Sequence, residues 1–187
     1  MLDYVRFSAH TEFMVTTVRR RSTAPRVLWL ACGVVLGAAA SLAADNPVLL
    51  TVACAGKPPL TLTAADLAQM PRVSATMERD GETSTYEGVL LYDILLKAYG
   101  LPPGKNLPVN PKISYILGTG RDGYQAMFAL AEIAPMFAGA RVIVADKRNG
   151  VPLLPYQQPL QVIAPQDKAQ GRAMYSLVKI EVVELKH

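Results

Sequence analysis

The segment TYEGVLLYDILLKAYGL, residues 85–101, joins a strand pattern directly to a helix pattern. Thr83 to Val89 reads as the second arm of a β-hairpin, and Leu90 to Tyr99 carries apolar residues at helical spacing. Gly100 is the residue type that commonly ends a helix, and the prolines that follow it prevent the helix from continuing. The sequence therefore predicts a strand that runs into a helix ending at Gly100.

The residues before this segment predict the first arm of the hairpin, two further strands and a short helix. The predicted elements are strands at Asn46 to Ala55, Leu60 to Leu62 and Val73 to Arg79, and a helix at Ala64 to Gln69. Thr63 and Asp66 have the spacing of a capping box at the start of that helix. Asp80-Gly81 is a turn pair between the two arms of the hairpin.

The residues after the segment are rich in strand patterns. The predicted elements are strands at Ile113 to Gly118, Tyr124 to Leu130, Ala140 to Asp146, Leu160 to Ala164 and Val178 to Leu185, with a helical turn at Ala131 to Ile133, a glycine-rich turn at Thr119 to Gly123 and a turn at Asn149-Gly150. Strands outnumber helices and do not alternate with them regularly. We therefore predict an α+β protein in which a mixed β-sheet and short helices form a single domain.

Residues 1–44 have the pattern of a leader and secretory signal peptide. Arg19-Arg20-Arg21 and Arg26 precede an apolar run from Val27 to Leu42, and small residues at Ala43 and Ala44 suit cleavage. The alternative, an uncleaved anchor, needs a longer run than these 16 residues. We expect an exported, periplasmic domain at residues 45–187 that meets the membrane only during export.

The charge distribution argues against nucleic-acid binding. The chain has a net charge of +4, but five arginines and only two carboxylates fall within residues 1–44. The remaining residues carry 14 basic and 13 acidic side chains, and they contain no basic stripe with interleaved aromatic residues. We interpret Lys147-Arg148, beside the Asn149-Gly150 turn, as a solvated pair.

The residue inventory also excludes several common enzyme classes. The two histidines are His10, in the leader, and the final residue, His187, so the predicted domain has no internal histidine for a histidine-dependent hydrolase or a His-based zinc site. The sequence contains no phosphate-binding P-loop and no dinucleotide-binding glycine pattern. Cys54 lies in an apolar run, where a lone thiol is typical of a core residue.

Five segments in order resemble the oxidoreductase molybdopterin-binding domain, which has the sulfite oxidase-like fold. They are LTLTAADLAQMP (60–71), TYEGVLLYDILLKAYGL (85–101), GRDGYQAMFALAEI (120–133), VIVADKRNGVPLLPYQQPLQVIAP (142–165) and GRAMYSLVKIEV (171–182). Gaps included, they span nearly the whole predicted domain. No single segment is specific, whereas the five in this order are.

The sequence departs from that family at the metal ligand. The family's cysteine, whose thiolate ligates molybdenum, lies in the strand before the aromatic-x-Gly-Val segment, where this chain has Glu78 or Arg79. A guanidinium cannot ligate a cationic metal, and a carboxylate is a hard substitute for a soft thiolate. The family's histidine near the proline-rich turn is replaced by Gln157 or Gln158. Molybdenum chemistry is therefore doubtful.

The resemblance places five residues in a pterin or molybdopterin-type ligand site: Arg79, Arg121, Asp122, Tyr124 and Arg172. Arginine can donate to a pterin carbonyl or a phosphate, aspartate can accept from the pterin amino group, and Arg172 matches a basic position near the cofactor's anionic tail. The alternatives are hairpin solvation for Arg79, an exposed turn for Arg121 and Asp122, and strand packing for Tyr124. Tyr86 and Tyr156 either stack on a flat heterocycle or pack internally.

Three functions follow from these features. The leading hypothesis is a periplasmic, non-catalytic pterin-binding protein, because cysteine-less members of this fold look like pterin sensors that signal to inner-membrane proteins, including enzymes of cyclic-di-GMP turnover. The second is a molybdenum-cofactor oxidoreductase of the sulfite oxidase family with an unusual ligand set. The third is an interaction domain without a small-molecule ligand.

Overall fold

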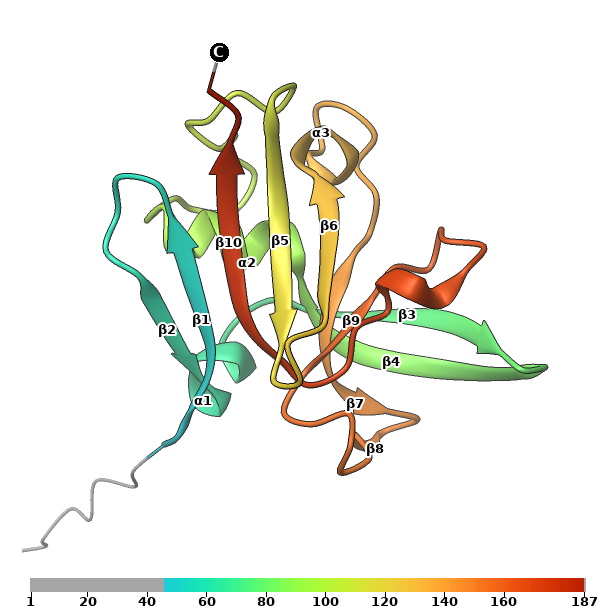
Figure 1. Cartoon of the computed structure of the whole chain (residues 1–187). Coiled ribbons are helices and arrows are strands. Elements are labelled where there is room, and N and C mark those ends of the chain that lie inside the picture. Colours follow the sequence, from blue (N-terminus) through green and yellow to red (C-terminus); the bar gives the residue numbers. More distant parts are fainter. Residues whose placement is uncertain (1–45, 187) are drawn as a thin grey trace, which may run out of the picture. The chain divides into compact units, whose positions relative to one another are not determined.

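The computed structural model describes residues 46–186, which form two β-sheets and short helices (Figure 1). The strands are β1 (Val48–Cys54), β2 (Leu60–Thr63), β3 (Arg72–Arg79), β4 (Glu82–Leu90), β5 (Ser114–Gly120), β6 (Gln125–Ala129), β7 (Ile143–Arg148), β8 (Val151–Pro152), β9 (Gln161–Ile163) and β10 (Leu177–Glu184). The helices are α1 (Ala64–Ala68), α2 (Leu91–Ala98), α3 (Leu130–Ile133) and the 3-10 helix η1 (Gln170–Arg172). The predicted α+β class is confirmed.

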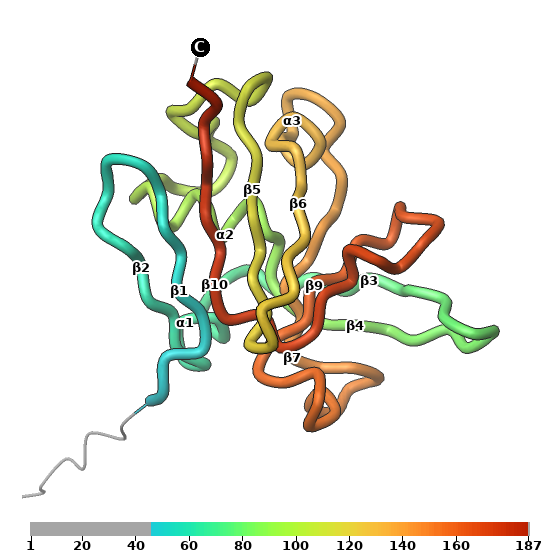
Figure 2. Tube along the Cα trace, viewed as in Figure 1, coloured from blue at the N-terminus to red at the C-terminus, as the bar shows by residue number. Residues whose placement is uncertain are grey.

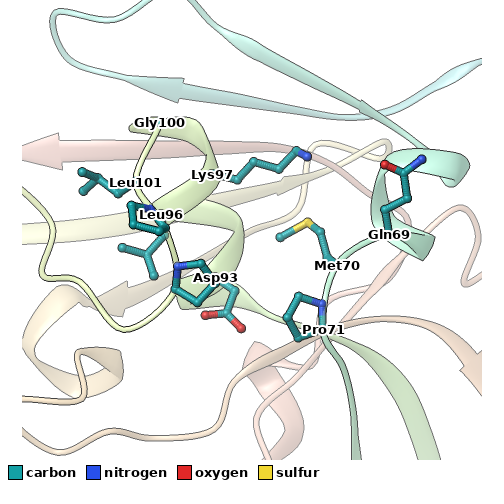
Figure 3. A pocket seen from close by; sticks show the side chains of 10 residues that line it. Gln69, Met70, Pro71, Asp93, Leu96, Lys97, Gly100 and Leu101 are labelled. Carbon is teal, nitrogen blue, oxygen red and sulfur yellow. The ribbon is translucent and has the colours of Figure 1, made fainter.

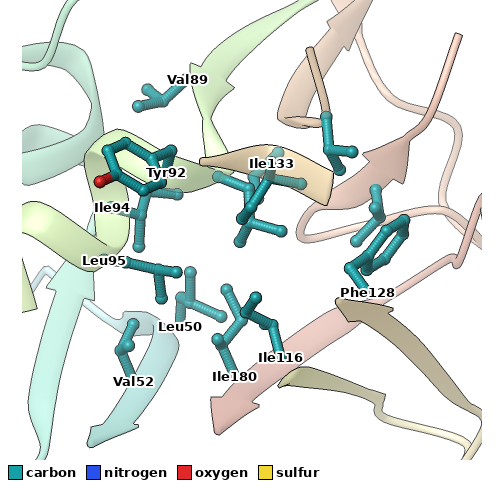
Figure 4. Packing of buried hydrophobic residues seen from close by; sticks show 14 of the residues in the cluster. Leu50, Val52, Val89, Tyr92, Ile94, Leu95, Ile116, Phe128, Ile133 and Ile180 are labelled. Atoms are coloured by element: carbon teal, nitrogen blue, oxygen red, sulfur yellow. The ribbon is translucent and has the colours of Figure 1, made fainter. Parts of the chain in front are cut away.

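The first sheet has the strand order β2-β1-β10-β5-β6, and α2 packs against one of its faces (Figure 1). β1 and β10 are parallel and the other neighbours are antiparallel, so the sheet is mixed, as predicted. Ile94 and Leu95 of α2 point toward Leu50, Ile116 and Ile180 of the sheet (Figure 4). These fully buried side chains are the centre of the main core, which explains the helical spacing of apolar residues in the segment 85–101.

The second sheet has the order β3-β4-β7-β8, with β9 on the other edge of β7. Gly88 of β4 is required where this strand meets β7, because an added Cβ would lie 2.1 Å from the Val144 carbonyl oxygen. A smaller cluster, which includes Met77, Tyr86 and Ile163, packs within this sheet. β4 runs directly into α2, so it links the second sheet to the helix under the first.

Two tight turns end the hairpins of the second sheet. Asp80 and Gly81 connect β3 to β4 with φ angles of 52° and 82°, and Asn149 and Gly150 connect β7 to β8 with φ angles of 51° and 78°. Two consecutive residues with positive φ are typical of the type I′ turn, for which Asp-Gly and Asn-Gly are favoured. Both turns were expected from these dipeptides. Arg79 and Arg148 are the last residues of β3 and β7, the two strands that flank β4.

The helix boundaries also follow local sequence signals. The Thr63 hydroxyl accepts from the Asp66 backbone N–H at 3.2 Å, and the Asp66 carboxylate accepts from the Thr63 N–H at 2.9 Å, which confirms the capping box. Tyr99 is the last residue of the α2 turn, and Gly100 follows with a φ of 70°. None of the helices within residues 46–186 combines the length and the apolar character needed to cross a bilayer.

The structure corrects several predicted boundaries. β5 continues through Gly120, so the turn comprises residues 121–124, and Tyr124 precedes β6 instead of beginning it. The long register of β5 with β10 explains the difference, because pairing extends to Leu177 opposite Gly120. β7 begins at Ile143 and not at Ala140, and β8 and η1 were not predicted. The predicted leader and its cleavage sites lie outside the described residues.

Candidate functional site

The two hairpin ends of the second sheet border a polar pocket of about 500 Å³. Its lining residues come from β3, β4, β7 and the segments on either side of β9: Arg79, Asp80, Glu82, Tyr86, Arg148, Tyr156, Gln157 and Tyr175. The volume is in the range of small-molecule sites. We refer to this cavity as the hairpin pocket.

Arg148 is held in this pocket by its position across from β4. The β4–β7 register pairs Arg148 with Tyr86, and its Nε donates to the Ser84 Oγ at 2.9 Å. The guanidinium carbon lies 6.0 Å from the centre of the Tyr86 ring, which is within reach of a cation–π interaction. Nη2 is 3.9 Å from the Glu82 carboxylate, a loose ion pair. The remaining N–H groups of Arg148 are charged donors at the pocket, and the Ser84 bond restricts their position.

Tyr86 is almost completely buried, with an exposed fraction of 3%. Burial raises the pKa of its phenol, and the positive charges of Arg148 and Arg79 partly offset that rise. The neutral phenol is therefore the stable form at ordinary pH. A neutral hydroxyl can donate to and accept from a polar ligand.

The opposite wall of the pocket is aromatic. The Tyr156 and Tyr175 rings meet edge to face with centres 5.4 Å apart, and the Arg79 guanidinium lies 5.7 Å from the centre of the Tyr175 ring. Tyr156 is 59% exposed, which leaves a large part of its surface available for contact. Exposed aromatic rings beside fixed charges are suited to binding a flat heterocycle. This geometry favours the stacking interpretation of Tyr156 over internal packing.

Opposite charges balance within the hairpin pocket. Two guanidinium groups, of Arg79 and Arg148, face two carboxylates, of Asp80 and Glu82. Gln157 adds a buried amide whose oxygen accepts from the Leu154 N–H at 3.1 Å. A site with equal numbers of opposite charges attracts a polyanion weakly and offers both donors and acceptors to a neutral polar ligand.

Of the five predicted ligand residues, Arg79 lies in the hairpin pocket. Arg121, Asp122 and Tyr124 lie together in the β5–β6 turn, and none of them lines this pocket. The Asp122 carboxylate accepts from the Tyr124 backbone N–H at 3.0 Å, and the Tyr124 hydroxyl donates to the Gly171 carbonyl at 2.5 Å. Arg121 is exposed. Arg121 and Asp122 thus lie in an exposed turn, which was the alternative interpretation for them. Tyr124 neither packs within a strand nor lines the hairpin pocket.

Arg172 also lies outside the hairpin pocket, and its guanidinium is already engaged. It donates to Glu132 at 2.8 and 3.0 Å and to Asp167 at 2.5 and 2.8 Å. These two carboxylates are the main cause of the rise in the pKa of Arg172. A guanidinium that is paired twice offers little to the anionic tail of a cofactor. In this structure, the Arg172 guanidinium belongs to an internal ion-pair cluster with Glu132 and Asp167, and its ligand contact stays a prediction.

Sequence reasoning missed four pocket residues, which are Asp80, Glu82, Arg148 and Tyr175. The solvated-turn interpretation of Arg148 was wrong, because the pairing of β7 with β4 places its side chain against Tyr86 and Ser84. The Asn149-Gly150 turn fixes only the pairing of Arg148 with Val151 in β8, so the local sequence carries no signal for the contact with β4. Tyr175 has no local signal either, because it enters from a segment nearly 100 residues away from Arg79.

The donor atoms of the described residues do not fit a thiolate-bound metal. Cys54 lies in β1 of the other sheet, is 7% exposed, and has a thiol pKa that burial raises. A raised pKa opposes formation of the thiolate that binds metals. Residues 46–186 contain no group of three histidine, cysteine or acidic side chains placed to hold an ion. The two carboxylates of the hairpin pocket are hard ligands without a thiolate beside them.

A second cavity of about 490 Å³ lies between α2 and the α1–β3 connection (Figure 3). Its walls are mostly apolar and include Met70, Leu96, Leu101 and prolines, with Asp93 at its edge. Burial raises the pKa of Asp93. Gln69 and Lys97 add polar groups to this cavity, but it has no aromatic wall and no arginine, so it offers a flat polar heterocycle neither a stacking surface nor a forked donor. The hairpin pocket is therefore the better candidate site.

The comparisons with known proteins support the fold. No protein-family model matches the chain, and no curated protein sequence matches it. Among solved structures, the sulfane dehydrogenase SoxCD from Paracoccus pantotrophus is similar, with a TM-score of 0.55 and 17% sequence identity. The match covers 71% of this chain and 37% of that chain, so this protein spans much less than the whole length of SoxCD. The likeness agrees with the predicted sulfite oxidase-like fold.

Proposed function

We propose that this protein is an exported, non-catalytic domain that binds a pterin in the hairpin pocket and passes the ligand state to an inner-membrane signalling protein. The observation that carries the proposal is the pairing of two guanidiniums and two carboxylates with three tyrosines in one pocket. By the sequence resemblance, Arg79 lies in the strand where the molybdopterin-binding family has its metal-binding cysteine. A site in that place without a thiolate suits the organic ring better than the metal.

The pocket groups match the hydrogen-bonding pattern of a pterin. The ring's amino group and ring N–H are donors, for which the carboxylates of Asp80 and Glu82 are acceptors. Its carbonyl and ring nitrogens are acceptors, for which Arg79 and Arg148 are donors. Tyr156 and Tyr175 offer aromatic surface to the ring face. The zero net charge of these four ionised groups also favours a neutral pterin over a phosphorylated one.

Export and signalling rest on other observations. The arginines and apolar run of residues 19–42 support export, and the resemblance to cysteine-less pterin sensors supports an inner-membrane partner. We expect the mature protein to begin just after Ala43 or Ala44, as measured by the intact mass of protein recovered from the periplasm. An unprocessed chain in the membrane fraction would instead support the anchor alternative.

Calorimetric titration tests the ligand directly. Tetrahydrobiopterin, handled without oxygen, is expected to bind the domain of residues 45–187 with a 1:1 stoichiometry, and oxidised biopterin serves as the second ligand. Guanosine, which has a similar donor and acceptor edge on a different ring system, is the control for unspecific heterocycle binding. Absence of saturable heat with either biopterin, in protein shown to be folded, would overturn the proposal.

A further inference from the structure

Residues 165–176 form a strap that joins β9 to β10 and runs beside the β3–β4 hairpin (Figure 2). Asp167 lies near its start, η1 lies in its middle, and its end supplies Tyr175 to the hairpin pocket. Two contacts connect it to the tip of β3. The Gln170 side-chain amide donates to the Glu78 carbonyl, and the Tyr175 ring lies against the Arg79 guanidinium.

The other side of the strap is held by Arg172. Its guanidinium bridges Asp167, in the strap itself, and Glu132, in α3. The guanidinium carbon also lies 4.5 Å from the centre of the buried Phe128 ring in β6. Planar pairing with two carboxylates and stacking on a ring restrict both the place and the orientation of the arginine. Arg172 therefore fixes η1 to β6 and α3 of the first sheet.

Tyr124 adds a second attachment at the same place. Its hydroxyl donates to the Gly171 carbonyl, between Gln170 and Arg172. The strap is thus bound to the first sheet through Arg172 and Tyr124, and to the hairpin of the second sheet through Gln170 and Tyr175. The hairpin tip, residues 79–82, is exposed and has few other contacts to hold it. The strap sets the distance between this tip and the aromatic wall of the pocket.

We propose that Arg172 is a positioning residue for the hairpin pocket: clamped by Glu132 and Asp167, it holds Gln170 of the same 3-10 helix where its side chain fixes the β3 tip. The expected effect of Arg172 on pterin affinity rests on the proposed function, whereas its expected effect on the order of the β3–β4 hairpin does not. Arg172 acts without touching the ligand. In this proposal, Arg172 supports the pocket wall instead of contacting the ligand, although it matches a ligand-facing position of the resembling family.

The experiment combines ligand affinity with hydrogen exchange in the domain of residues 45–187. Arg172→Gln is expected to weaken biopterin binding about tenfold, a coupling typical of residues within one network. Gln170→Ala, which keeps the Arg172 ion pairs, is the second variant, because it removes the hairpin contact without leaving the half-buried carboxylates of Glu132 and Asp167 unpaired. Lys168→Gln is the matched control, since it removes one positive charge from an exposed position of the same strap.

The double variant separates positioning from general destabilisation. If Arg172 acts through Gln170, Arg172→Gln should cost clearly less affinity in the Gln170→Ala background than in the wild-type background. In ligand-free protein, both single variants should speed amide exchange at residues 78–82 and leave β10 unchanged. Equal affinity losses in both backgrounds, or faster exchange throughout the domain, would overturn the positioning role.

The two readouts also distinguish this inference from the proposed function. Failure of the wild-type protein to bind biopterin refutes the pterin proposal alone, because faster exchange at residues 78–82 would still support the strap. Unchanged exchange at these residues in both variants refutes the strap even if biopterin binds.

Discussion

Replacement of Arg148 by methionine is expected to weaken biopterin binding by roughly 10- to 150-fold. The guanidinium supplies charged donors to the hairpin pocket, and a hydrogen bond from a charged group contributes about 1.5–3 kcal/mol. Its position is set in advance by the bond from Nε to the Ser84 hydroxyl and by the Tyr86 ring, so little ordering is required on binding. The variant loses the charge and keeps a similar length of apolar side chain.

Isothermal calorimetry with tetrahydrobiopterin measures this effect, with Lys147→Met as the matched control. Lys147 is the preceding residue of β7, is exposed, and does not line the pocket, so its replacement removes the same charge from the opposite face. Arg148→Lys should fall between the two, because an ammonium keeps the charge but not the forked donor geometry. Affinity in Arg148→Met equal to that in Lys147→Met would refute the assignment of this guanidinium to the ligand site.

Three further predictions concern stability. Gly88→Ala should destabilise the domain by about 3 kcal/mol in urea unfolding, because the added Cβ would meet the β7 backbone and force the two strands apart; an unchanged midpoint would contradict the close approach. Gln161→Leu should stabilise it by about 1–3 kcal/mol, since the fully buried amide has no hydrogen-bond partner on either atom within the described residues; a lower melting temperature would indicate that the amide is satisfied. Burial and the nearby Cys54 thiol raise the pKa of Tyr99 to about 12, above the value of about 10 for an unfolded chain. Between pH 10 and pH 12 the unfolded chain ionises this phenol while the folded protein does not, so the free energy of unfolding falls over that interval. Tyr99→Phe lacks the phenol, and its free energy of unfolding should therefore fall less. Parallel curves of unfolding free energy against pH for the two proteins would contradict the raised pKa.

Much of the fold could be predicted because its signals are local. The helical spacing in residues 90–99 reports a helix that packs on one sheet face, and the Thr63–Asp66 pair reports a helix start. Asp80-Gly81 and Asn149-Gly150 specify turns through the backbone angles that these residues tolerate. Each signal depends on neighbours within a few residues, so it can be read without knowledge of the tertiary structure.

The site was predicted less well because it depends on contacts between distant segments. Arg79 was identified, but Arg148 enters the pocket through strand register and Tyr175 through the path of the strap. Arg172 was predicted as a ligand residue because it matches a basic position of the family that the sequence resembles. Its second partner, Glu132, lies 40 residues away, and the pairing shows that the charge is used within the protein. Charge alone therefore does not distinguish a residue that binds a ligand from one that positions a pocket.

The most direct test of the account is a mass spectrum of the small molecules that the protein retains when it is purified from the periplasm without oxygen and then denatured. The account predicts one pterin per protein chain, released on denaturation and fluorescent after oxidation, with no molybdenum in the same sample. A stoichiometric amount of molybdenum, or protein that carries no ligand and takes up no added pterin, would contradict it.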